Sequence, residues 1–159
     1  MEQKNLSKWL KLILIGVGIC GLIIYAAVIP MYGLSLRASY PEFSNRFWPW
    51  LIFLWVSGIP CFIVLFYAWK ITSNIEKDMS FSENTAALLK RISILSVADA
   101  GFFFLGNIVM LLLNMSHPSV VIASFIIVFV GVAVSVASAV LSHLVKKAAA
   151  LQEQSDLTI

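Results

Sequence analysis

The sequence predicts an all-α membrane protein, a bundle of four transmembrane helices with both termini in the cytoplasm. Charged residues are only 12% of the 159 residues, whereas soluble domains have roughly 25%. Four apolar tracts with almost no charge occupy most of the chain, and each is long enough for the roughly 20-residue helix that crosses a bilayer. No length remains for a separate soluble domain, so residues 1–159 are expected to form one integral membrane domain.

The four spans are expected at about residues 12–33, 48–69, 92–114 and 120–145. Pro30 is expected to bend or end the first span, which leads into a polar loop at 34–46. The second span begins among Trp and Phe residues typical of a membrane interface, and Pro60 near its middle is expected to kink it. A tight turn at 115–119 joins the last two spans.

Two polar segments flank the last two spans. The first is a loop at 70–91, in which Ser80 and Glu83 have the spacing of a capping box. Ser82 is a second candidate N-cap, so a helix is expected to begin here and then enter the membrane. The second segment is the tail, 146–159, whose alanines are expected to extend the fourth helix into water.

The placement of basic residues predicts the orientation. Nine of the 11 Lys and Arg residues belong to the N-terminal segment, the loop at 70–91 and the tail, whereas Arg37 and Arg46 lie on the other side. The positive-inside rule places the side with nine in the cytoplasm. The net charge of +3 therefore reports topology, and no direct nucleic-acid binding is expected.

Asp99 lies inside the third predicted span, where an aspartate costs about 2.5 to 3.5 kcal/mol. We count equal depths inward from Arg91 and Lys146, the charged residues at the edges of two spans. The count places Ser138 level with Asp99, and Ser135 one turn further, so these three are expected to form an intramembrane polar site. One interpretation is a proton- or cation-coupled site, and the other is a protonated aspartate that only holds two helices together.

Small residues recur along the fourth span at spacings of seven, four, three and four: Ser124, Gly131, Ser135, Ser138 and Ser142. They occupy a narrow arc of a helix, and small residues let helices approach closely in lipid. Packing within the chain is the preferred interpretation, and the seam of a homodimer is the alternative.

The sequence shows no pattern typical of catalysis. No His, Cys, Asp or Glu residues have metal-ligand spacing, and no nucleophile lies beside a recognisable base. Cys20 and Cys61 stand alone in apolar tracts and are interpreted as small packing residues. The chain is therefore expected to be no enzyme and to need no cofactor.

Three segments resemble a known family: Trp69-Lys70 leading to Ile75, residues 81–93, and the ending Ala-Ala-Leu-Gln-Glu-Gln-Ser-Asp-Leu-Thr-Ile at 149–159. They are similar to the YoaS-like proteins, an uncharacterised family of small four-span bacterial membrane proteins. The family has no established activity, and its genes often lie beside that of a small helix-turn-helix regulator. The resemblance implies a multi-pass protein of the bacterial cytoplasmic membrane with a DNA-binding partner.

The leading hypothesis is an interaction protein that binds and regulates or sequesters that regulator. Acidic residues of the loop and tail are the candidate contacts, because a DNA-reading surface is basic. They are Glu76, Asp78, Glu83, Glu153 and Asp156. In a plainer interpretation these acids are only a solvated rim. The alternative function is a small transporter or efflux subunit that uses Asp99, and a weaker one is a membrane-stress sensor bending at Pro60.

Overall fold

The structure is a computed structural model that describes residues 2–39 and 41–156. Within these ranges every regular element is helical, and four rods are long and apolar enough to cross a membrane. The all-α fold class with four spans is therefore confirmed. The elements in chain order are α1 (Glu2–Ile23), the π-helix η1 (Ile24–Val28), α2 (Ile29–Ser39), the 3-10 helix η2 (Pro41–Arg46), α3 (Phe47–Glu76), α4 (Glu83–Leu112) and α5 (Pro118–Asp156).

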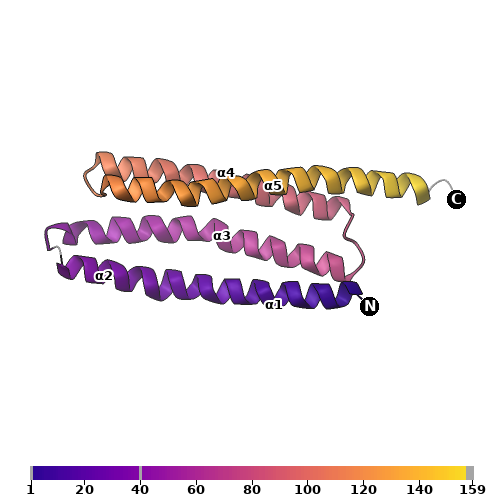
Figure 1. The fold of residues 1–159 in the computed structure, drawn as a ribbon, viewed down its shortest axis with the longest axis horizontal. Coiled ribbons are helices and arrows are strands. Elements are labelled where there is room, and N and C mark those ends of the chain that lie inside the picture. The colour runs from indigo at the N-terminus through magenta and orange to yellow at the C-terminus, as the bar shows by residue number, and fades with distance from the viewer. Residues whose placement is uncertain (1, 40, 157–159) are drawn as a thin grey trace.

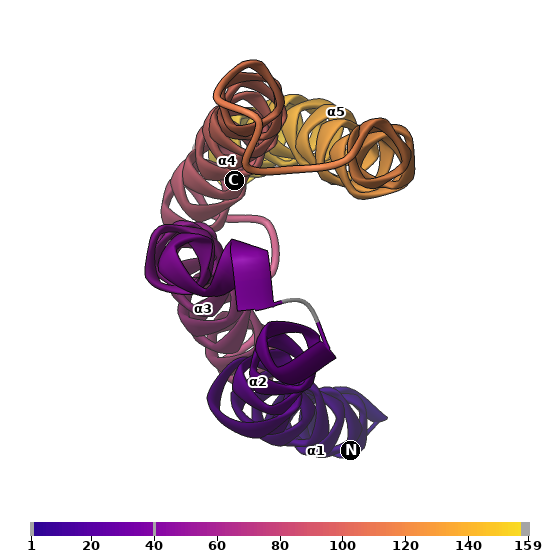
Figure 2. The same cartoon turned by 90° about the vertical axis from the view of Figure 1, so that its left-hand side faces the viewer.

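The helices form an open, curved row (Figures 1 and 2). The rod of α1, η1 and α2 packs on α3, α3 packs on α4, and α4 packs on α5. Across the two described ranges, the backbone of α1 approaches neither α4 nor α5, and the backbone of α3 does not approach that of α5. The row is thus more open than a closed four-helix bundle. The start of α1, the α3–α4 turn and the end of α5 lie at one end of the molecule, here called the terminal end (Figure 1).

Large apolar side chains point outward along the whole length of the row. In the most apolar window of the first rod none of the residues is buried, and in that of α5 only 11% are. Phe129 and Ile126 of α5, for example, are 74% and 70% exposed. Exposure of such an apolar surface to water is unfavourable, so the surface fits an environment of lipid hydrocarbon.

The first rod continues through Pro30 instead of ending there, because η1 ends two residues before the proline. Proline has no N–H, and its ring displaces the carbonyl group four residues earlier. A π turn accommodates this change without ending the helix. Helix α2 therefore reaches Ser39, and the irregular loop expected at 34–46 is replaced by helix on both sides of residue 40.

Helix α3 bends near its middle (Figure 1), close to Pro60, as predicted. It continues to Glu76, seven residues past the expected end of the span at 69. The cap of α4 is Ser82, whose Oγ accepts from the backbone N–H of Thr85 at 3.2 Å, so the second candidate cap is the correct one.

Helix α5 is the longest, with 39 residues, or about 58 Å at 1.5 Å per residue. A bilayer core is about 30 Å thick, so a large part of α5 lies outside it. Its last turns project past the other helices at the terminal end (Figure 1). The predicted helical extension of the tail is confirmed through Asp156, and the remainder of the tail, 157–159, is outside the described residues.

Candidate functional site

The small residues of α5 face α4 and are bonded to it. Ser142 donates a hydrogen bond from Oγ to the carbonyl of Ala86 at 2.7 Å. Ser135 donates from Oγ to the carbonyl of Ser93 at 2.8 Å, and the two seryl Oγ atoms lie 3.1 Å apart. Each pair is a contact across the helix interface within one chain.

The rest of the stripe completes this seam. Ser124 and Ser138 are 3% and 8% exposed. A Cβ built on Gly131 would lie 3.1 Å from the Cβ of Ala100, so the absence of a side chain lets the two helices approach. Packing within the chain, the preferred interpretation of the stripe, is confirmed. The stripe is occupied by α4 and does not serve as a homodimer seam.

The same pairs give the register between α4 and α5. From Ala86 to Ser93 the contact advances seven residues along α4, and on α5 it moves back seven, from Ser142 to Ser135. Four residues beyond Ser142 on α5, and four residues before Ala86 on α4, this register places Lys146 level with Ser82. Arg91 and Lys146 therefore do not mark the same depth, because α4 begins eight residues before Arg91.

The prediction that Asp99 forms one site with Ser135 and Ser138 is therefore wrong. In the observed register Asp99 is level with Phe129 of α5, and Ser135 is bonded to Ser93 instead. Asp99 also lies on a different face of α4, since Ala100, one residue or about 100° away, is the residue that packs on α5.

Asp99 contacts α3. The thiol of Cys61 donates to its Oδ2 at an Sγ to Oδ2 distance of 3.8 Å. The other carboxyl oxygen, Oδ1, is buried and has no hydrogen-bond partner in the described part of the chain. A buried polar atom without a partner is uncommon in a protein and calls for a physical reason.

Tyr25 of η1 brings the first rod to the same place. Its phenol lies within electrostatic range of Ser57, Cys61 and Asp99. Its ring lies against Gly58, because a Cβ on that glycine would be 2.7 Å from Tyr25 Cε1. We call Tyr25, Ser57, Cys61 and Asp99 the three-helix polar site.

The backbone around this site is irregular on two helices. Tyr25 lies in the π turn, and its carbonyl accepts a hydrogen bond from Trp55 Nε1 at 3.0 Å. Gly58 and Cys61 flank Pro60, where α3 bends. Tyr25 was not among the residues predicted from the sequence, and Cys61 was predicted only to pack. The signals present were a proline five residues after Tyr25 and a glycine two residues before Pro60.

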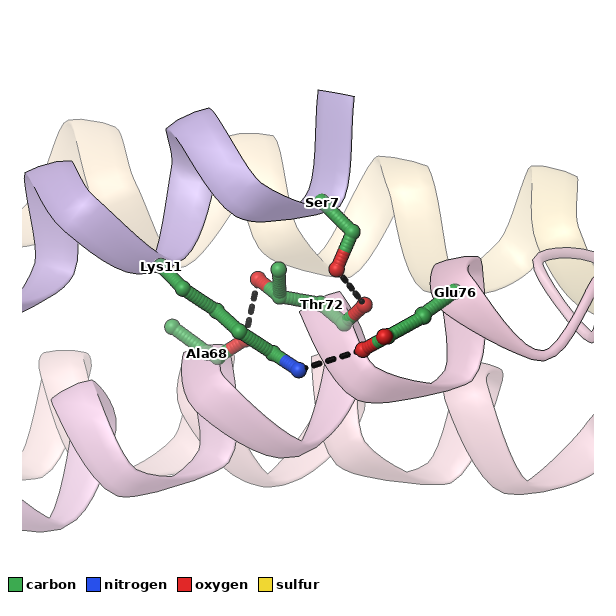
Figure 3. Close-up of polar contacts among 5 residues, drawn as sticks. All are labelled: Ser7, Lys11, Ala68, Thr72 and Glu76. Atoms are coloured by element: carbon green, nitrogen blue, oxygen red, sulfur yellow. Dashed lines mark hydrogen bonds and ion pairs between the residues drawn. The ribbon is translucent and has the colours of Figure 1, made fainter. Parts of the chain in front are cut away.

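A second polar cluster ties α1 to α3 at the terminal end (Figure 3). Ser7 Oγ donates to the carbonyl of Thr72 at 3.0 Å, and the hydroxyl of Thr72 donates to the carbonyl of Ala68 at 2.9 Å. Lys11 Nζ forms an ion pair with the carboxylate of Glu76. Lys11 reaches along the helix pair toward the terminal end, as lysines do when their stems lie in an apolar layer.

Glu76 therefore has a partner inside the protein. It lies past the expected end of the second span, and the hydrogen bond and charge of Lys11 hold the pKa of its carboxyl below the ordinary value. The same lysine lies 5.5 Å from the ring centroid of Trp69. We accordingly remove Glu76 from the candidate partner contacts.

The other candidate acids are placed differently. Asp78, Glu83 and Glu153 are exposed, and none of them has an ion-pair partner among the residues described. Asp156 is the last residue of α5, and its side chain lies outside the described residues. Glu153 lies about eight residues, or about 12 Å, beyond the level of Glu83 in the α4–α5 register. Within the described ranges no three His, Cys, Asp or Glu residues are grouped to hold a metal ion.

Comparison with known proteins gives a relative and a family. The chain is 29% identical over 150 residues, 93% of its length and 92% of the relative's, to the "Uncharacterized membrane protein YoaS" of Bacillus subtilis (strain 168). No solved structure matches significantly. The family model described as "Protein of unknown function (DUF2975)" matches residues 35–159, and the chain belongs to this family.

Proposed function

We propose that this protein is a membrane-bound interaction protein that binds a small cytoplasmic DNA-binding regulator and so regulates or sequesters it. The observation that supports the proposal most is the end of α5, which projects past the other helices at the terminal end (Figure 1). Its last described turns, 151–155, are helical and exposed. A projecting helix of this kind offers a preformed surface to a partner.

The terminal end carries nine Lys and Arg residues, and among them lie three exposed carboxylates that suit a basic partner. Asp78, Glu83 and Glu153 are exposed carboxylates that are not neutralised by ion pairs in the described part of the chain. They are spread over more than one turn of helix, which fits an extended protein surface better than a small ion. Regulators that bind DNA carry Lys and Arg for the phosphates, and opposite charges speed and orient such encounters.

The test is co-purification in mild detergent with the small helix-turn-helix protein that the family resemblance predicts beside the gene. Full-length protein is compared with a chain ending at Lys147 and with the triple variant Asp78→Asn, Glu83→Gln, Glu153→Gln. Glu42→Gln is the matched control, because it removes an acid at the other end of the molecule. We expect the control to retain the regulator, the other two to lose most of it, and the loss to resemble that caused by high salt. Equal recovery with all four proteins would exclude this surface.

The alternative, a small transporter or efflux subunit, has one observation in its favour, the unpartnered Oδ1 of Asp99. The row of helices is open, so a single chain with α1 and α5 apart encloses no path across the membrane. A transporter would need a second copy to close it. Cross-linking in native membranes that recovers only monomer would count against transport, whereas a dimer in which Asp99→Asn abolishes uptake would favour it.

A further inference from the structure

We propose that the three-helix polar site is an intramembrane protonation site: Asp99 takes a proton as its ligand, and Cys61 holds the neutral acid between α4 and α3, with Tyr25 of η1 nearby. This inference goes beyond the proposed function and does not depend on a protein partner. It rests on the geometry of the carboxyl group and on the charges around it.

The two carboxyl oxygens of Asp99 have different surroundings. Oδ2 accepts from the thiol of Cys61, and Oδ1 is buried without a partner. An uncharged O–H group that lacks one hydrogen bond is only modestly unfavourable when buried. An ionised oxygen in the same position is much more unfavourable, unless a cation neutralises it. The neutral acid is therefore the form that this geometry tolerates.

The cations on these helices are all distant from Asp99. On α4 itself the nearest is Arg91, eight residues or about 12 Å away. On α3 it is Lys70, nine residues or about 13 Å from Cys61, and on the first rod it is Arg37, 12 residues or about 18 Å from Tyr25.

The titratable groups near Asp99 come from α3 and the first rod. Helix α3 contributes the thiol of Cys61 and the first rod contributes the phenol of Tyr25. Both groups are neutral over the ordinary pH range, with reference pKa values of about 8.5 and about 10. On α5 the level of Asp99 is occupied by Phe129. No neighbour in the described part of the chain supplies a positive charge, so the proton is the ligand that can neutralise Asp99.

The site also explains why the irregular backbone is placed where it is. The π turn and the bend at Pro60 lie on the two helices that face Asp99. Together with the bare backbone of Gly58, they let the ring of Tyr25 reach α3 at the depth of the acid. Loss of the proton would put a charge between α3 and α4, and we expect it to weaken their contact.

The test is infrared spectroscopy of the full-length protein in phospholipid nanodiscs, following the carbonyl stretch of a protonated carboxylic acid. We expect this band at neutral pH, and we expect it to disappear on alkaline titration. It should be absent in Asp99→Asn and unchanged in Asp78→Asn, the matched control on an exposed acid. Cys61→Ala should keep the band at a shifted frequency, because it removes the thiol donor to Oδ2 and leaves the acid in place.

A second measurement uses the unaltered chain and does not depend on the folding of a variant. Dicyclohexylcarbodiimide reacts with protonated carboxyl groups in apolar surroundings, and mass spectrometry identifies the modified peptide. We expect several-fold more modification at Asp99 than at Asp78 or Glu83, falling as the pH rises. Absence of the infrared band at neutral pH, its persistence in Asp99→Asn, or modification confined to the exposed acids would each overturn the proposal.

Discussion

The ring of Tyr25 lies directly on the backbone of Gly58, at a distance that leaves no space for a methyl group on the glycine. This contact joins the π turn of the first rod to α3 beside Pro60. It is therefore the point at which two helix irregularities, separate in the sequence, become one packing arrangement.

Gly58→Ala is expected to destabilise the protein, because its Cβ would lie 2.7 Å from Tyr25 Cε1. Overpacking of this kind typically costs about 1 to 3 kcal/mol. The measurement is the melting temperature in mild detergent. Gly101→Ala is the control, since nothing lies within 4 Å of its added Cβ. In a Tyr25→Ala background the effect of Gly58→Ala should largely vanish, and an undiminished effect would contradict this explanation.

The ion pair of Lys11 with Glu76 predicts a pH-dependent contribution to stability. Since Lys11 lowers the pKa of the folded carboxyl, the contribution is complete above the unfolded value of about 4.3. It is lost as the pH falls through the lowered folded value. We expect the melting temperature of Glu76→Gln to be slightly below that of the unmodified protein at neutral pH and equal to it in strong acid. High salt should also reduce the difference, and a difference that grows in acid would contradict the assignment.

The number and order of the helices could be predicted from the sequence because the length of an apolar tract decides whether it spans a bilayer. Their ends could not, since hydropathy reports where lipid ends and not where a helix ends. Helix α5 continues to Asp156 because Lys, Ala, Gln and Glu are good helix formers in water. Helix α3 continues to Glu76, where Ser7 and Lys11 of α1 bond to its last turns. The same difference explains why the wrong partners were predicted for Asp99. The count assumed that Arg91 and Lys146 lie at the same depth, but α4 and α5 extend into water by different lengths.

The partners of Asp99 were beyond prediction for a second physical reason. A π turn adds one residue to a helical turn, so it rotates all that follows by about 100° relative to a regular helix. The face on which Tyr25 lies therefore depends on a backbone irregularity that hydrophobic periodicity does not show. The small-residue stripe of α5 was predictable because α5 is regular, and Ser135 and Ser142 lie where a 3.6-residue period puts them.

Ser82→Ala should destabilise the protein by about 1 kcal/mol, the usual value for a lost N-cap. Its Oγ accepts from the N–H of Thr85 and lies 3.0 Å from the Thr85 hydroxyl, so the substitution leaves a helix end without its bond. Ser80→Ala is the control, because Ser80 has the capping-box spacing but lies outside the cap. Thermal unfolding would contradict the assignment if the two variants behaved alike.

Gly131→Leu is expected to separate α4 from α5, because even a Cβ there approaches Ala100 at 3.1 Å. Overpacking and the loss of close approach should lower the melting temperature more than Ser135→Ala does. A hydrogen bond between helices in a membrane is worth only about 0.6 kcal/mol on average. Val136→Leu, on a side chain that is 58% exposed, is the matched control for added volume. A smaller effect of Gly131→Leu than of the control would contradict the seam.

The orientation predicted from the distribution of Lys and Arg can be tested by thiol labelling of intact cells. In a background with Cys20 and Cys61 replaced by alanine, a single cysteine is placed at Asn45 or at Lys77. Both positions are exposed, and they lie at opposite ends of the row, in η2 and after α3. Since nine of the 11 basic residues are at the terminal end, we expect a membrane-impermeant maleimide to label Asn45→Cys and to reach Lys77→Cys only after lysis. The reverse pattern would place α5's projecting end outside the cell, where no cytoplasmic regulator could meet it.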